Sequence, residues 1–141
     1  MAECVQEIID ELSLWSHVHT DERRSGSTEF RLGPRSIGHV HRWGIVDIAF
    51  PVDVRNHLIE VGRTDSHYPY PQSGWTTFYL ESKDDVDTAL QLLRLSYLIQ
   101  IQTLKRSPAG RSELADIDVP NELATLDISD DLREMIYSQG E

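Results

Sequence analysis

The chain has 141 residues, of which 39% are hydrophobic and 26% are charged, so its size and composition are those of one globular domain and not of a disordered segment. Its net charge of −11 disfavours binding to nucleic acid or to an anionic membrane, because both need a basic protein surface. No apolar run approaches the roughly 20 residues of a membrane-spanning helix, and the acidic, polar start of the chain is unlike a signal peptide.

The first predicted element is an amphipathic helix at about residues 2–15. Its apolar side chains recur at helical spacing and form one buried stripe: Val5, Ile8, Ile9, Leu12 and Trp15. Cys4 lies on this helix and is interpreted as a small hydrophobic residue. Because it is the single cysteine, it excludes an internal disulfide and a cysteine-based zinc site, and it favours a reducing cytoplasm.

Strand-like segments follow. Residues 17–26 are polar and turn-rich, with room for one short strand. Alternation or β-branched and aromatic content predicts strands at residues 28–32, 36–42, 45–50 and 75–80. Trp43 and Gly44 form the predicted hairpin turn between the second and third of them. Pro51 suits the first turn of a helix that runs to about Val61 and ends at Gly62.

A long helix is predicted after Ser82, which would cap it, with Asp85 in capping-box position. Apolar residues cover more than one of its sides: Val86, Leu90, Leu92, Leu93, Leu95, Tyr97, Ile99, Ile101 and Leu104. Strands joined by short connections imply an antiparallel sheet whose apolar face is covered by the helices at both ends. The predicted fold class is α+β, a two-layer sandwich of an antiparallel sheet covered by an N-terminal and a long C-terminal helix.

Two parts of the chain differ in charge. Residues 1–106 form the predicted domain, whereas residues 107–141 are an acidic tail with nine acidic and two basic residues. Ser129 caps a short helix near 129–137, whose few apolar residues either dock on the domain or stay mobile. Such a tail could contact a protein partner. The many acids and only two lysines suit a salt-loving source, or an acidic protein from an arginine-rich genome.

His39 and His41 are separated by one residue on a predicted strand, so their imidazoles share one face. Strand histidines at this spacing can hold a divalent metal when a third ligand is near. The candidates for that ligand are His67, Asp47, and His17 or His19, the last two of which repeat the spacing. Three interpretations remain open: a metal site, a metal-free histidine pocket for binding or catalysis, and structural histidines.

The loop from His67 to Gly74 contains two prolines, which stiffen it. It presents Tyr70, Ser73 and then Trp75, a composition that suits a ligand pocket or a cap on the end of the sheet. Trp75 is predicted to face away from the core, on the side of Tyr79. Ser73 lacks the surroundings of a hydrolase nucleophile, and the glycines (Gly33, Gly38, Gly44) do not form a phosphate-binding loop.

Several linked motifs resemble the luciferase-domain family. Residues 29–41 (EFRLGPRSIGHVH) are similar to its motif EFRLG.REIGHLH, and residues 47–51 (DIAFP) are similar to D.PFP. The same order continues with four further elements: 54–55 (VR), 62–63 (GR), 67–75 (HYPYPQSGW, against HH.LPDSGW) and 92–97 (LLRLSY). The resemblance covers roughly residues 28–100. Its last part is also similar to frataxin-like (YjbR-like) α+β sandwich domains.

The resemblance implies a fold more firmly than a reaction. Fungal luciferases of this family oxidise a hydroxylated pyrone with oxygen and without a metal or flavin, which implies no cofactor here. The family pattern points to seven positions of this chain: His39, His41, Arg63, His67, Ser73, Gly74 and Trp75. Tyr68 and Gln72 depart from it, and both departures remove an ionisable group from the loop.

Three functions are therefore weighed. The first is a small-molecule enzyme or binding protein in which His39, His41 and His67 act as general base and orienting groups, and Tyr70 and Trp75 hold a planar ligand. The second is a non-catalytic interaction module whose acidic tail contacts a protein. The third is a metal-binding protein in which His39, His41 and His67 hold a divalent ion.

Overall fold

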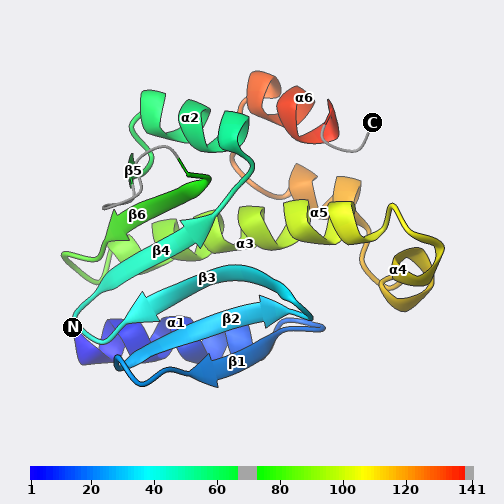
Figure 1. Cartoon of the computed structure of the whole chain (residues 1–141). Coiled ribbons are helices and arrows are strands. Elements are labelled where there is room, and N and C mark those ends of the chain that lie inside the picture. Colours follow the sequence, from blue (N-terminus) through cyan, green and yellow to red (C-terminus); the bar gives the residue numbers. More distant parts are fainter. Residues whose placement is uncertain (67–72, 139–141) are drawn as a thin grey trace.

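An antiparallel sheet forms one layer of the protein, and helices pack against it (Figure 1). The computed structural model describes residues 1–66 and 73–138, and in this part the sheet has six strands in the order β1-β2-β3-β4-β6-β5. The strands are β1 (His19–Glu22), β2 (Ser27–Leu32), β3 (Arg35–His41), β4 (Ile45–Ala49), β5 (Asp65–Ser66) and β6 (Trp75–Tyr79). The α+β prediction is confirmed, and the four predicted strands are β2, β3, β4 and β6.

The described helices are α1 (Ala2–Ser13), α2 (Val52–Glu60), α3 (Asp85–Leu104), α4 (Pro108–Glu113), α5 (Val119–Ala124) and α6 (Asp130–Ser138). Helices α1 and α3 cover the same face of the sheet (Figure 1). α2 is the helix predicted after Pro51, and it connects β4 to β5. Strand β5, only two residues long, has no alternation to reveal it and was not predicted. None of the described helices is both long enough and apolar enough to cross a membrane.

Helix α3 is buried on several sides, as predicted, because it contacts the sheet, α1 and α5. It begins at Asp85, two residues later than a cap at Ser82 predicts. The carboxylate of Asp85 still accepts the backbone N–H of Ser82 at 3.1 Å, which is the acceptor half of a capping box. Gly38 lets α3 approach β3 closely, since a Cβ at this position would lie 2.5 Å from the carbonyl oxygen of Asp47 and 3.2 Å from Leu93.

A β-bulge interrupts the pairing of β2 with β3. Phe30 pairs with Gly38, whereas Arg31 pairs with Ser36, so Ile37 is the extra residue. Ile37 is fully buried in the core, and the side chain of His39 lies on the opposite face. The bulge therefore explains how two residues of the same parity on one strand serve different faces.

The acidic tail docks on the rest of the protein. α5 packs on α3, and α6 packs on α2 (Figure 1). The tail contributes six buried apolar residues to the single hydrophobic core: Leu114, Ile117, Val119, Leu123, Leu132 and Ile136. The helix predicted near 129–137 is α6, and Ser129 Oγ accepts the N–H of Leu132 at 3.1 Å as its cap. Of the two alternatives for the tail, the structure thus shows the docked one.

Candidate functional site

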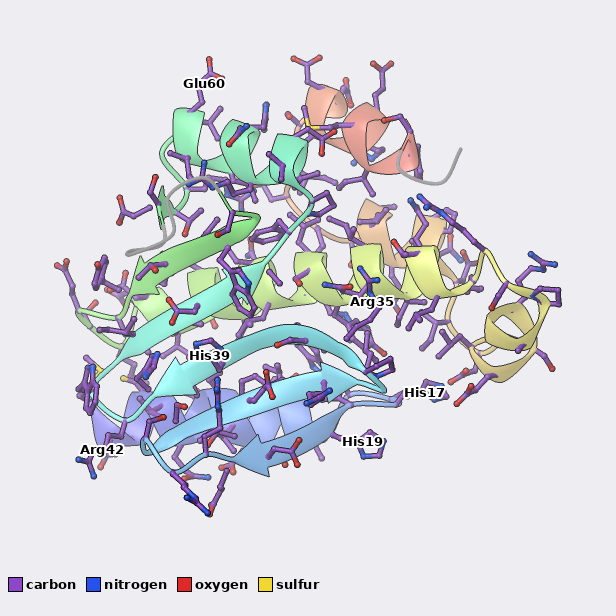
Figure 2. The ribbon with its side chains drawn as sticks, viewed as in Figure 1. His17, His19, Arg35, His39, Arg42 and Glu60 are labelled. Atoms are coloured by element: carbon purple, nitrogen blue, oxygen red, sulfur yellow. The ribbon has the colours of Figure 1, made fainter. Side chains whose placement is uncertain are left out.

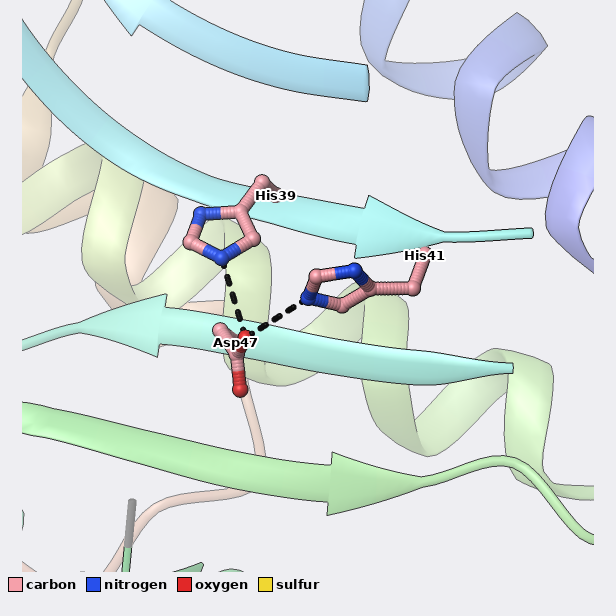
Figure 3. Close-up of side chains that lie close together, drawn as sticks. All are labelled: His39, His41 and Asp47. Atoms are coloured by element: carbon pink, nitrogen blue, oxygen red, sulfur yellow. Dashed lines mark hydrogen bonds and ion pairs between the residues drawn. The ribbon is translucent and has the colours of Figure 1, made fainter. Parts of the chain in front are cut away.

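The two strand histidines meet one carboxylate of the neighbouring strand (Figure 3). His39 and Asp47 are paired residues of β3 and β4, so their side chains lie on the same face of the sheet. The Nε2 atoms of His39 and His41 lie 2.9 and 3.0 Å from the same oxygen, Asp47 Oδ2. The prediction that both imidazoles share one face is confirmed. We call this face, opposite to α1 and α3, the histidine face.

Asp47 is a buried carboxylate with only 3% of its surface exposed. Thr77 of β6 donates its hydroxyl proton to Asp47 Oδ1 at 2.8 Å, opposite the histidines. Burial by itself would raise the pKa of the Asp47 carboxyl, but the hydrogen bonds from His39, Thr77 and His41 outweigh it and hold this pKa well below its usual value of 3.8. Asp47 is therefore a fixed negative charge at neutral pH.

Two tryptophans flank the histidines. The ring of Trp75 is 5.3 Å from the ring of His39 at an angle of 47°, and the ring of Trp43 stacks on His41 at 5.8 Å and 17°. Trp75 is partly exposed and Trp43 is 55% exposed. Tyr79 shares the face of Trp75, as predicted, because the two are separated by three residues on β6. The site thus combines a charged centre with flat apolar walls.

A polar row runs across the sheet through this site. Residues paired in register place Glu29 of β2 opposite His39, His39 opposite Asp47, and Asp47 opposite Thr77. The Nδ1 atom of His39 points away from Asp47 (Figure 3). It is buried and has no hydrogen-bond partner among the residues that the structure describes. A buried ring nitrogen without a partner is unfavourable, so the site is not fully satisfied as it stands.

The comparisons with known proteins identify this part of the chain. Residues 34–96, which include both histidines, Asp47 and Trp75, match the model of the luciferase domain. This segment belongs to the luciferase-domain family. Searches of curated proteins and of solved structures found no match to the chain, so the likeness to frataxin-like domains stays a prediction.

The structure describes three of the other predicted ligand-binding residues of the luciferase domain. Arg63 donates a hydrogen bond to the carbonyl oxygen of Asp127 in the tail at 3.1 Å, and not to His39 or His41. Ser73 Oγ accepts the N–H of Trp75 at 3.2 Å. A Cβ on Gly74 would lie 2.2 Å from the Phe50 carbonyl oxygen, so only glycine fits there. Ser73 and Gly74 thus have structural roles at the start of β6, and a role in ligand binding stays a prediction for all three.

His67 and Tyr70, together with the departures Tyr68 and Gln72, lie outside the described residues. Their predicted places in the site are therefore predictions still.

His17 and His19, which are candidates for a third ligand, lie apart from His39, toward the β2–β3 turn (Figure 2). His17 Nε2 is 3.0 Å from Asp116 of the tail. Both histidines line a cavity of about 320 Å³ between the β2–β3 turn and α4. Among the candidate ligands that the structure describes, the three that lie together are His39, His41 and Asp47.

Three contributors to the site were missed or undervalued from the sequence. The sequence makes Asp47 a candidate metal ligand, and its place in the middle of an otherwise apolar strand is a further signal of a functional residue. Thr77 has no sequence signal beyond its place in β6, since its role depends on the pairing of β6 with β4. The sequence predicts Trp43 as a turn residue, and only the hairpin geometry brings its ring onto His41.

Proposed function

We propose that this luciferase-domain protein binds a planar, hydroxylated small molecule on the histidine face and exchanges a proton with it. The observation that supports this most is the shared hydrogen-bond acceptor, a single oxygen of Asp47 that fixes the imidazoles of His39 and His41. Buried carboxylates that orient a histidine are a recurrent part of sites for proton transfer.

The proposed general base is His41. A neutral imidazole that donates its Nε2 proton to Asp47 keeps a lone pair on Nδ1, and that nitrogen can take a proton from a ligand hydroxyl. The side chain of His41 is 23% exposed, against 13% for His39, so His41 is the easier of the two to reach. Asp47 stabilises the imidazolium that proton transfer creates.

The aromatic residues supply the proposed binding walls. A planar ligand would lie against Trp75 and Trp43, since stacked or tilted rings at 4.5–7 Å, as seen for both histidines, are favourable arrangements. Deprotonating a phenol makes it electron-rich. This is the step that the likeness to oxygen-using luciferases suggests, and the proposed reaction class is therefore a cofactor-free oxidation of a planar phenolic molecule in which molecular oxygen accepts the electrons.

The proposal is tested with EDTA-treated protein and a set of planar phenols, pyrones and their methyl ethers. We expect a free hydroxylated compound to raise the melting temperature and to quench the fluorescence of Trp43 and Trp75, since a ligand that binds the folded state stabilises it. The methyl ethers should bind more weakly. His41→Ala should abolish the effect, whereas His19→Ala, at an exposed position on the edge strand, should keep it. Equal binding by His41→Ala would contradict the proposed site.

A further inference from the structure

The cluster at the centre of the histidine face has the composition of a metal-binding site. Among the described residues, His39, His41 and Asp47 are the group of three ligand-type side chains whose ligand atoms all lie within 4.8 Å of one another. They come from two adjacent strands whose pairing fixes their backbones. Two imidazoles and one carboxylate with further positions free are a donor set that first-row transition metals favour.

The spacing of the three atoms suits a single ion. Metal–ligand bonds to histidine nitrogen and carboxylate oxygen are about 2.1 Å long, so neighbouring ligands on one ion are roughly 3 Å apart. The two Nε2 atoms lie 2.9 and 3.0 Å from Asp47 Oδ2. These distances equally fit hydrogen bonds, and the choice between the two depends on the ring protons.

The hydrogen-bonding needs of the two ring nitrogens favour a metal ion over two hydrogen bonds to Asp47. If both histidines donate Nε2–H to Asp47, each Nδ1 becomes a bare acceptor, and that of His39 is buried without a partner among the described residues. The neighbour directly opposite His39 on β2 is Glu29, on the same face, and a carboxylate also only accepts. When Nε2 binds a metal instead, the proton moves to Nδ1, and histidine ligands commonly donate this proton to a carboxylate. Glu29 Oε1 lies 3.5 Å from Arg31 Nη1 and outside hydrogen-bond distance of His39 Nδ1, so Glu29 would supply that carboxylate after a change of side-chain rotamer.

We propose that His39, His41 and Asp47 hold one divalent first-row transition-metal ion, and that Glu29 orients His39 from behind. This inference rests on the proposed function for its ligand, a planar hydroxylated molecule at the same site, but it replaces the metal-free proton transfer. With Nε2 on the ion, Nδ1 of His41 carries the ring proton, and the ion instead of His41 would activate the ligand hydroxyl. The ion would offer its remaining positions to water or to the hydroxyl oxygen of the bound molecule. Imidazole ligands favour Zn²⁺, Co²⁺ and Fe²⁺ over Mg²⁺ and Ca²⁺, which prefer oxygen.

The first experiment titrates EDTA-stripped full-length protein with Co²⁺ and follows its visible absorption and the heat of binding. We expect one Co²⁺ per chain, displaced by Zn²⁺ and not by Mg²⁺. His41→Ala and Asp47→Asn should each weaken binding by about 100-fold or more, and Glu29→Gln by about 10-fold. His19→Ala and His57→Ala, on β1 and α2, are matched controls and should bind as the unchanged protein does.

A second measurement does not depend on the folding of any variant. In ¹⁵N spectra of the imidazoles, Zn²⁺ should shift the Nε2 signals of His39 and His41 and leave those of His19 and His57 in place. Unshifted His39 and His41 signals at saturating Zn²⁺, or Co²⁺ affinity unchanged in a folded His41→Ala, would overturn the metal site.

The planar ligands are then tested with EDTA and with Zn²⁺. Binding in EDTA that His41→Ala removes supports the proposed function even where the metal titration is negative, which would refute only the metal site. One bound metal without any binding of planar ligands would confirm the metal site and refute the proposed function. The two failures are therefore distinguishable.

Discussion

Thr77 and Asp47 are paired across strands β6 and β4, and the Thr77 hydroxyl donates to Oδ1 of Asp47 at 2.8 Å. The other oxygen of Asp47 faces the histidines of β3. One buried carboxylate thus links three adjacent strands through side chains as well as through the backbone ladder. The orientation of both imidazoles therefore depends on a residue of a strand that carries neither of them.

Thr77→Val removes this hydroxyl and keeps the shape of the side chain. Because Oδ1 then loses a buried donor, we expect the free energy of unfolding to fall by about 1–3 kcal/mol. The affinity of the histidine face for Co²⁺ should fall by about 10- to 100-fold, the usual effect of losing a group that orients a metal-binding residue. Urea denaturation and Co²⁺ titration measure the two effects. Thr76→Val is the matched control, since Thr76 faces the core, and it should leave Co²⁺ binding unchanged. A similar loss of Co²⁺ affinity in both variants would refute the specific role of Thr77.

The pH dependence of stability should show the low pKa of the Asp47 carboxyl. A carboxyl whose pKa is lower in the folded than in the unfolded protein stabilises the fold above its usual pKa of 3.8, and this contribution is lost as the pH falls through the folded pKa. In EDTA, Asp47→Asn should therefore be less stable than the unchanged protein at pH 5–7, and the difference should shrink below about pH 4. Urea denaturation across this range measures it. Asp21→Asn, at an exposed position of β1, should show no such convergence.

The variant Trp75→Ala tests whether Trp75 is part of the binding site or part of the core. Trp75 is partly exposed and contacts His39, so the loss of stability should stay below the roughly 3–5 kcal/mol of a fully buried tryptophan. Binding of planar ligands should be lost. Denaturation and thermal-shift measurements test both points. Trp15→Ala, which instead removes a contact with Tyr97 at 5.2 Å, is expected to destabilise the fold without changing ligand binding.

The docked tail should be needed for stability. Leu123 of α5 is fully buried, so Leu123→Ala should lower the free energy of unfolding by about 2–5 kcal/mol. Leu14→Ala, at an 80% exposed position, should have little effect. Removal of residues 107–141 should lower the melting temperature by about 10 °C or more, because it uncovers α3 and α2. A deletion variant that melts like the full chain would mean that the tail adds nothing to the core.

The fold was largely predictable, because the elements that bury apolar residues show it in their spacing. Helix α3 is evident from the spacing of its apolar residues, and strands β3 and β4 are evident from the hairpin turn that joins them. The pairing of His39 with His41 on one face also followed from strand periodicity. The docked tail did not, since its six buried residues are thinly spread: Leu114 and Ile117 lie outside the helices, and α5 and α6 bury only two residues each. Nor did Thr77, because sequence spacing does not reveal which residues of β6 stand beside Asp47.

The bulge at Ile37 gives the site a sensitivity to chain length. Ile37 is locked in the core, and the extra residue is what turns His39 and His41 outward after it. Deleting Ser36 would let β3 resume regular alternation. If Ile37 then stayed in the core, both imidazoles would turn to the core face of the sheet. The bulge therefore shifts by one residue the alternation of β3 side chains between the two faces of the sheet. A one-residue deletion here should therefore cost either the core contacts of Ile37 or the site itself, with every residue of the cluster still present.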